Sequence, residues 1–164
     1  MDTRLRKLKS GEYDGVILAE AGLERLNVEI PYELLDQSPF VPSPGQGIIA
    51  VVSRRGSEES EILKRIDDAE TRVEAEVERE VLKAIGGGCS LPVGVHASCR
   101  GKKVDLTVYI GSTAENFLFQ KIQVDKEHSL EEARTFISEL LAAHPSLLRT
   151  SDCSDNFGEP LTRQ

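Results

Sequence analysis

The sequence contains few aromatic residues, few cysteines and no long hydrophobic run. Among its 164 residues there are three cysteines and no tryptophan. Three cysteines cannot all pair within one chain, and their spacing lacks the close paired repeats of a structural zinc site, so we expect neither a disulfide framework nor a metal site. No apolar run approaches the roughly 20 residues that span a bilayer, and the amino-terminal residues lack the apolar core of a secretion signal. We therefore expect a cytoplasmic protein that does not bind membranes.

Positive charge is also scarce. The chain has 20 lysines and arginines against 28 aspartates and glutamates, which gives a formal net charge of -8. Such a chain repels phosphate backbones, so general affinity for nucleic acid is excluded. Its apolar fraction of 39% is enough for one or two small domains with a hydrophobic core.

The chain opens on a helical pattern. Leu5 and Leu8 fall on one face of a helix that is capped near Asp2. This helix starts almost at once, as if the chain began within a fold. The apolar run 16–19 has the length and branching of a buried strand, and a helical turn follows at 21–26. Helix, strand and helix at this spacing are typical of a parallel α/β sheet.

A segment rich in proline and glycine interrupts this pattern at 39–47. It contains three prolines and two glycines, so it can be neither a helix nor a central strand. We interpret it as a crossing between domains or as a site loop. The fully apolar run 48–52 is a second strand candidate, and 58–66 follows as a short polar helix.

From about residue 67 the pattern predicts a separate α+β domain. Asp67 or Asp68 caps a long helix, whose apolar residues recur every four positions on one face. Glycines 86–88 end this helix. The apolar positions in this helix are Val73, Val77, Val81 and Ile85.

Alternating residues beyond the glycines predict a three-stranded antiparallel sheet. The strands lie near 93–97, 104–110 and 117–124, with a hairpin turn at 100–102. Ser129 and Glu132 have the spacing of a capping box, and they open a helix that His144 and Pro145 end.

Cys89 is the most informative single residue. It follows Gly86, Gly87 and Gly88, so a large group can reach its sulfur. The alternative is a small buried side chain beside a helix cap. His96 lies on a predicted strand and nothing fixes its orientation toward the cysteine, so a nucleophilic triad is not supported.

Two arginines form a second candidate set. Arg4 and Arg25 lie in helical segments that flank the same predicted strand, where guanidinium groups can clamp carboxylates in a bidentate manner. The alternative is that both are solvated surface residues. Glu78 and Arg79 are interpreted as part of an exposed charged helix face.

Six segments taken together resemble the porphobilinogen deaminase family, also called hydroxymethylbilane synthase. The resemblance is clear over roughly residues 1–100, and the following sheet and helix fit the family by pattern only. The segments appear in the order and spacing of the family at 2–8, 11–19, 21–26, 44–47, 78–79 and 87–94.

The resemblance implies a transferase of tetrapyrrole (porphyrin and haem) biosynthesis, which joins four porphobilinogen molecules into hydroxymethylbilane and releases ammonia each time. By position, Cys89 would hold a covalent dipyrromethane cofactor through a thioether. Arg4 and Arg25 fall on family positions that bind the acid groups of cofactor or substrate. Gln46 falls on a loop that lines the family's cleft.

The expected fold class is α/β. Partial parallel sheet segments like those of periplasmic binding proteins are followed by an α+β domain with a three-stranded antiparallel sheet and helices. Residues 1–42 are a remnant of the family's second domain, and 43–66 return to its first domain. Residues 67–150 form the carboxy-terminal domain that anchors the cofactor, and 151–164 are a loose tail.

The resemblance implies that the family's catalytic aspartate lies in the part that precedes the Asp2-Thr3-Arg4 motif, which we expect to be missing from this chain. No catalytic residue is therefore assigned here, and we expect the chain alone to be inactive. The expected partners are porphobilinogen and linear pyrrole intermediates, together with a separate chain supplying the amino-terminal half if the enzyme is split. Three alternatives stay open: a fragment, one half of a split enzyme, or a relic used as a non-enzymatic binding or interaction module.

Overall fold

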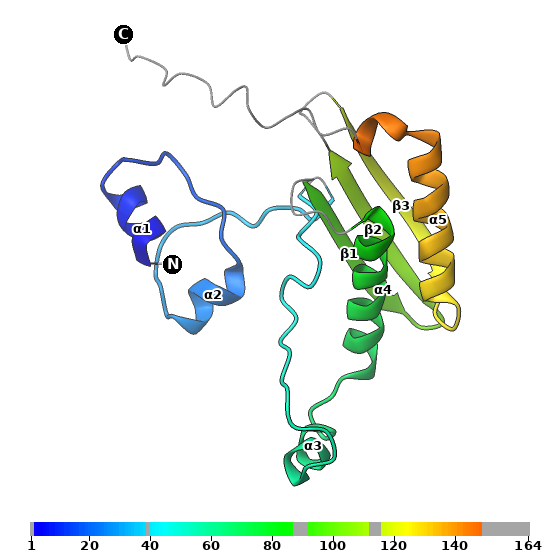
Figure 1. The fold of residues 1–164 in the computed structure, drawn as a ribbon. Helices are drawn as coiled ribbons and strands as arrows, with labels where there is room; N and C mark the ends of the chain where they lie inside the picture. Colours follow the sequence, from blue (N-terminus) through cyan, green and yellow to red (C-terminus); the bar gives the residue numbers. More distant parts are fainter. Residues whose placement is uncertain (1, 39, 87–91, 112–115, 149–164) are drawn as a thin grey trace. The chain divides into compact units, whose positions relative to one another are not determined.

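The computed structural model describes residues 2–38, 40–86, 92–111 and 116–148. It divides into two compact units, Met1–Asp36 and Gln37–Gln164, called unit 1 and unit 2 below. Figure 1 shows the elements of both units.

Unit 1 is small and contains two helices. Helix α1 spans Asp2–Lys9 and helix α2 spans Glu20–Arg25, which confirms both helical predictions. Each helix contributes one buried leucine, Leu5 and Leu23. A hydrogen bond of 3.0 Å from the Tyr32 hydroxyl to Glu20 ties the end of the unit to the start of α2.

The parallel strands expected at 16–19 and 48–52 are wrong for this structure, since both runs lack regular secondary structure. Ile17 is 72% exposed and Val52 is 91% exposed, which is far from the burial of a parallel strand. A strand needs a neighbour to accept and donate its backbone hydrogen bonds, and no described segment pairs with either run. The sheet that the described residues do form is antiparallel.

Unit 2 contains this sheet, in the order β1-β2-β3. Strand β1 spans Val93–Arg100, β2 spans Lys103–Gly111 and β3 spans Phe117–Asp125. Val95 pairs with Val108, which in turn pairs with Gln120 on β3. Both the sheet and the predicted hairpin are confirmed.

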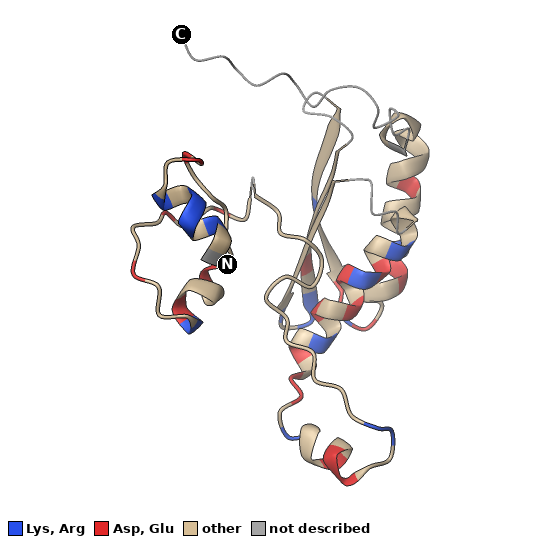
Figure 2. Cartoon of the chain, turned by 60° about the vertical axis from the view of Figure 1, so that its left-hand side comes forward, with Lys and Arg blue, Asp and Glu red and all other residues tan. Residues whose placement is uncertain are grey.

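The helices of unit 2 are α3 (Glu58–Leu63), α4 (Ala69–Ile85) and α5 (Ser129–Ala143), and a 3-10 turn η1 follows at Pro145–Leu148. Helices α4 and α5 cover one face of the sheet (Figure 1), and Figure 2 shows that face from the side. The core lies between these two helices and the sheet. It consists of Val77, Val81, Ile85, Val95, Ala97, Val104, Leu106, Val108, Ile110, Val124, Ala133, Ile137 and Leu147.

The ends of α4 are as the sequence predicts. The carboxylate of Asp68 accepts a hydrogen bond of 2.7 Å from the backbone N–H of Thr71, which caps the first turn. At the other end Gly86 has a φ of 99°, the left-handed conformation that ends helices and favours glycine.

The capping box predicted for α5 is wrong, because both of its side chains bind the turn that precedes the helix. The cap residue is His128. The Ser129 hydroxyl donates to the carbonyl of Lys126 at 3.1 Å, and Glu132 accepts from the backbone N–H of Asp125 at 2.9 Å. Asp125 ends β3, an edge strand of the sheet, so the two side chains bond backbone groups at the end of this strand rather than those of their own helix.

Candidate functional site

Cys89 lies outside the described residues, but the residues on both sides of segment 87–91 are described. Helix α4 ends at Gly86, and a Cβ added at Gly86 would meet nothing within 4 Å. Pro92 and then Val93 follow this segment, and β1 begins at Val93. Cys89 therefore lies in the sequence between the end of α4 and the start of β1.

The edge of β1 that faces away from β2 is bonded over most of its length. The backbone N–H of Val95 donates to the carbonyl of Pro42 at 2.9 Å. Two glutamates of α4 take the next outward N–H groups: Glu78 accepts from Ala97 at 2.9 Å, and Glu74 accepts from Cys99 at 2.7 Å. An open sheet edge would offer these donors to another chain. Here a loop and a helix of the same unit close the edge.

Gly94 lets segment 41–45 approach this edge of β1. A Cβ placed at Gly94 would lie 2.6 Å from the carbonyl oxygen of Val41 and 2.8 Å from its Cβ. No real side chain tolerates such a contact with backbone. Glycine at this position therefore permits the packing of segment 41–45 against the start of β1.

Glu78 corrects the sequence-based interpretation, which placed it on an exposed face. The residue is only 4% exposed. One carboxylate oxygen accepts from Ala97, and the other accepts from the backbone N–H of Gly45 at 2.6 Å. His96 lies beside it, with Nδ1 at 3.8 Å from Oε1. Helical periodicity alone cannot reveal this burial, because the loop that covers Glu78 comes from 33 residues earlier in the chain.

The loop 44–47, which carries Gln46, makes two successive tight turns. The N–H of Gln46 donates to the carbonyl of Ser43 at 3.0 Å, and the N–H of Ile48 donates to the carbonyl of Gly45 at 3.1 Å. Gly45 and Gly47 have φ values of 77° and 86°. These left-handed positions explain the two glycines of the motif. Gln46 itself is exposed, so its amide is available to solutes.

Arg4 and Arg25 lie in α1 and α2, and both are exposed. Figure 2 shows the basic residues on these helices. Among the described side chains, neither arginine forms an ion pair with a carboxylate. Both arginines belong to unit 1, and Gln46 belongs to unit 2.

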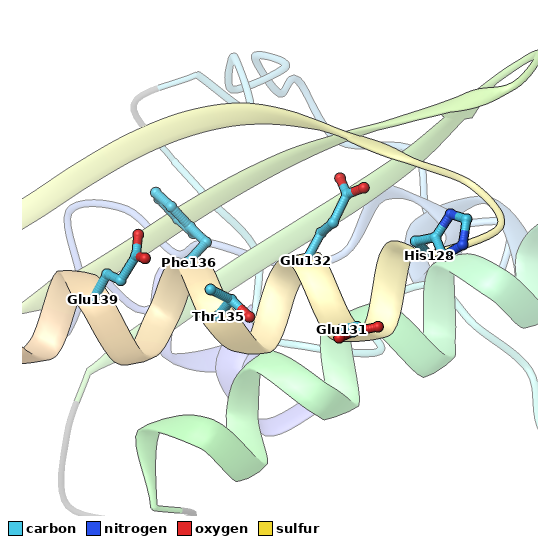
Figure 3. A pocket seen from close by; sticks show the side chains of 6 residues that line it. All are labelled: His128, Glu131, Glu132, Thr135, Phe136 and Glu139. Atoms are coloured by element: carbon cyan, nitrogen blue, oxygen red, sulfur yellow. The ribbon is translucent and has the colours of Figure 1, made fainter.

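Two further features lie in unit 2. An open hollow on α5 is lined by three glutamates together with His128, Thr135 and Phe136 (Figure 3). Nearby, donor atoms of Asp125, Glu127 and His128 lie within 4.8 Å of one another. Asp125 already accepts from the N–H of Glu127 at 3.0 Å, and this bond holds the pKa of its carboxyl below the usual range. The group therefore serves the turn before α5.

Two family models match consecutive parts of the chain. Residues 1–62 match the model described as porphobilinogen deaminase, dipyromethane cofactor binding domain. Residues 72–142 match the model described as porphobilinogen deaminase, C-terminal domain. The chain belongs to the porphobilinogen deaminase family. The resemblance seen in the sequence is thus confirmed over both parts.

Named relatives of this family agree with the two models. A probable porphobilinogen deaminase of Methanocella arvoryzae is 47% identical over 106 residues, which are 65% of this chain and 35% of the relative. That of Ignicoccus hospitalis is 50% identical over 106 residues, with the same coverage. The porphobilinogen deaminase of Helicobacter acinonychis is 36% identical over 144 residues, 86% of this chain and 47% of the relative. The chain thus spans between a third and a half of the length of these relatives.

The two matches divide the candidate residues. Arg4, Arg25 and Gln46 lie in the part matched by the cofactor-binding model, whereas Glu78 and Cys89 lie in the part matched by the C-terminal model. The hydrogen bond between Gly45 and Glu78 therefore joins the two family segments. No helix among the described residues has the length and apolar character to cross a membrane.

Proposed function

We propose that this chain supplies the cofactor-holding part of a cytoplasmic porphobilinogen deaminase. The reaction is the condensation of four porphobilinogen units into hydroxymethylbilane, with loss of ammonia at each step, in tetrapyrrole biosynthesis. The observation that carries the proposal is the match of residues 1–62 to the dipyromethane cofactor binding domain. The C-terminal match, which contains Cys89, supports it.

In this proposal Cys89 holds dipyrromethane through a thioether. The bound group would supply the pyrrole end to which porphobilinogen is added. Arg4 and Arg25 bind the carboxylates of acetate and propionate arms, for which a guanidinium offers a planar pair of donors. Their exposure, without ion pairs among the described residues, is compatible with this role. Gln46 presents its amide from the 44–47 loop.

The relatives contain long segments that this chain does not match. We propose that condensation also requires those segments, including a carboxylate that handles the proton of the pyrrole nitrogen. A separate chain that carries them would be the partner of a split enzyme. None of the described residues is assigned this proton transfer.

Intact-mass analysis tests the role of Cys89. The chain is co-expressed with the part of the Methanocella arvoryzae relative that it does not match, and the purified complex is assayed for hydroxymethylbilane. We expect a covalent adduct of dipyrromethane mass on the wild-type chain and none on Cys89→Ser. Cys99→Ser is the matched control, because burial raises the pKa of the Cys99 thiol and makes it a poorer nucleophile.

Three outcomes separate the alternatives. Activity of a complex whose Cys89 is an unmodified thiol would overturn the cofactor assignment. Sustained bilane formation by the isolated chain would show that the unmatched segments are not required. A well-folded complex with neither adduct nor activity would favour a non-enzymatic interaction module.

A further inference from the structure

We propose that Glu78 is a positioning residue that fastens the 44–47 loop to helix α4 and so fixes the backbone that carries Gln46. The fastening is a property of this chain. The consequence for substrate or cofactor contact rests on the proposed function above.

The geometry of the carboxylate carries the first step. Its two oxygens take two backbone donors from different segments, Gly45 at 2.6 Å and Ala97 at 2.9 Å. An ionised carboxylate has acceptors only, so both bonds are satisfied at once. A glutamine of the same shape would have to turn its NH2 group toward one of these N–H groups and lose that bond. The site thus selects a carboxylate over an amide.

Burial supplies the second step. At 4% exposure the carboxylate is removed from water, and a buried charge persists only where hydrogen bonds compensate its lost hydration. Both of its hydrogen bonds run to other segments and none to its own helix. An apolar side chain would fill the same space in α4, but it would leave Gly45 and Ala97 with unbonded N–H groups. The charge therefore serves attachment of the loop as well as closure of the β1 edge.

The position of the contact supplies the third step. Upstream of Gly45, two contacts hold the segment to β1. The Val95 N–H donates to the carbonyl of Pro42, and Val41 packs against Gly94. Downstream, the described hydrogen bonds of residues 48–66 are all local, and apolar residues such as Ile49 and Val52 are exposed. Gly45 is thus the last anchored point before Gln46 and this exposed stretch. If the Gly45 contact is lost, the nearest anchor is Pro42, four residues before Gln46.

Amide hydrogen exchange of the full chain tests the fastening directly. In the wild type, the Gly45 amide should be protected, whereas the Gly47 amide should exchange freely. These two glycines share the loop and the left-handed φ, but no described hydrogen bond is made by the Gly47 N–H. Equal, fast exchange at both amides would overturn the proposal, and this measurement requires no variant.

Two matched variants extend the test. In Glu78→Gln the remaining oxygen should stay on the buried N–H of Ala97, because the exposed Gly45 can bind water instead. Exchange at Gly45 should therefore speed up by about tenfold or more, the effect of losing a hydrogen bond to a charged group, while α5 and β3 stay protected. Glu74→Leu removes the acceptor of the Cys99 N–H on the same strand edge and should leave Gly45 protected. An equal increase in the exchange rate at Gly45 in both variants would mean that the glutamates only stabilise β1, and it would overturn the specific role of Glu78.

Activity of the complex described above supplies the functional readout. Glu78→Gln and Gln46→Ala should each lower kcat/KM, and the double variant should be no worse than Gln46→Ala alone, since one residue acts through the other. If the two substitutions lower kcat/KM additively, Glu78 does not act by positioning Gln46. If the complex makes no bilane at all, the proposed function fails, yet the exchange experiment still decides whether Glu78 holds the loop.

Discussion

At the scale of single residues, Gly94 is the described glycine at which an added Cβ would come closest to backbone, at the carbonyl of Val41. The carbonyl of Val41 occupies the space that a Cβ of residue 94 would take. The same approach places the neighbouring Pro42 carbonyl on the N–H of Val95. One missing side chain therefore permits both the packing of the crossing segment and the closure of the β1 edge.

We predict that Gly94→Ala destabilises unit 2. The added methyl forces the segment 41–45 away from β1, and overpacking of this kind costs about 1–3 kcal/mol. Chemical denaturation, monitored by circular dichroism, measures the decrease in the free energy of unfolding. Gly15→Ala is the control, because a Cβ at Gly15 meets nothing within 4 Å and its φ is not left-handed. Equal effects of both substitutions would contradict the close contact.

The residues that sequence reasoning identified correctly act within one turn of their own position. Asp68 caps the N–H of Thr71, and Gly86 ends its own helix, so local pattern suffices for both. The same local pattern wrongly predicts that Glu78 is exposed, because its partners lie 33 and 19 residues away. Cys89, Arg4, Arg25 and Gln46 stay predictions as site residues, since their roles depend on a ligand rather than on the fold.

At the scale of elements, helices α4 and α5 are joined by an ion pair above the core. Nε of Arg134 donates to Glu80 at 2.7 Å, and Lys83 lies 3.3 Å from the same carboxylate. Arg134 above all, with Lys83, holds the pKa of Glu80 below its usual range. The ionised glutamate is thus favoured by folding.

This pair predicts a specific pH dependence. Because the folded pKa of Glu80 is lower than the unfolded one, its stabilisation is present above the unfolded pKa and is lost as pH falls through the folded pKa. Arg134→Ala should cost up to about 1 kcal/mol at neutral pH, given that Arg134 is largely exposed. The difference in the free energy of unfolding between Arg134→Ala and wild type should become smaller at acidic pH. Arg79→Ala is the control, because Arg79 is an exposed arginine without a described ion pair. Its difference from wild type in the free energy of unfolding should be the same at neutral and at acidic pH, as measured by denaturation.

The antiparallel strands were predictable because their alternation is satisfied within the chain, whereas the runs 16–19 and 48–52 have no described strand beside them. A periodic pattern indicates which face of a strand is buried, but it does not show whether a neighbouring strand is present to pair with it. Strand β2 illustrates the first case, since it is paired on both edges and Val104, Leu106, Val108 and Ile110 all point into the core.

We predict that Leu106→Ala is among the most damaging core substitutions. Leu106 is 1% exposed on the central strand, and truncation of a buried leucine costs about 2–5 kcal/mol. Denaturant unfolding of the full chain measures the change. Leu34→Ala is the matched control, because Leu34 is 66% exposed and lies in unit 1. A small effect of Leu106→Ala would contradict the placement of the core on this face of the sheet.

At the scale of the whole molecule, the two units have very unequal cores. Among the described residues of unit 1 the buried apolar side chains are Leu5 and Leu23, whereas the cluster in unit 2 includes residues of α4, α5, η1 and all three strands. Residues 48–66 add exposed apolar side chains and contribute nothing to that cluster. Hydrophobic burial dominates the free energy of folding, so stability is concentrated between α4 and η1.

Limited proteolysis with trypsin tests this distribution. The first cuts should fall at Arg54 and Arg55, which are exposed and outside any helix or strand, and then at Arg65 just before α4. A fragment that begins after Arg65 and includes η1 should persist longest, because every further cut inside it must open the shared core. Preferential survival of a fragment from unit 1, or loss of both units at the same rate, would contradict the concentration of stability in residues 67–148.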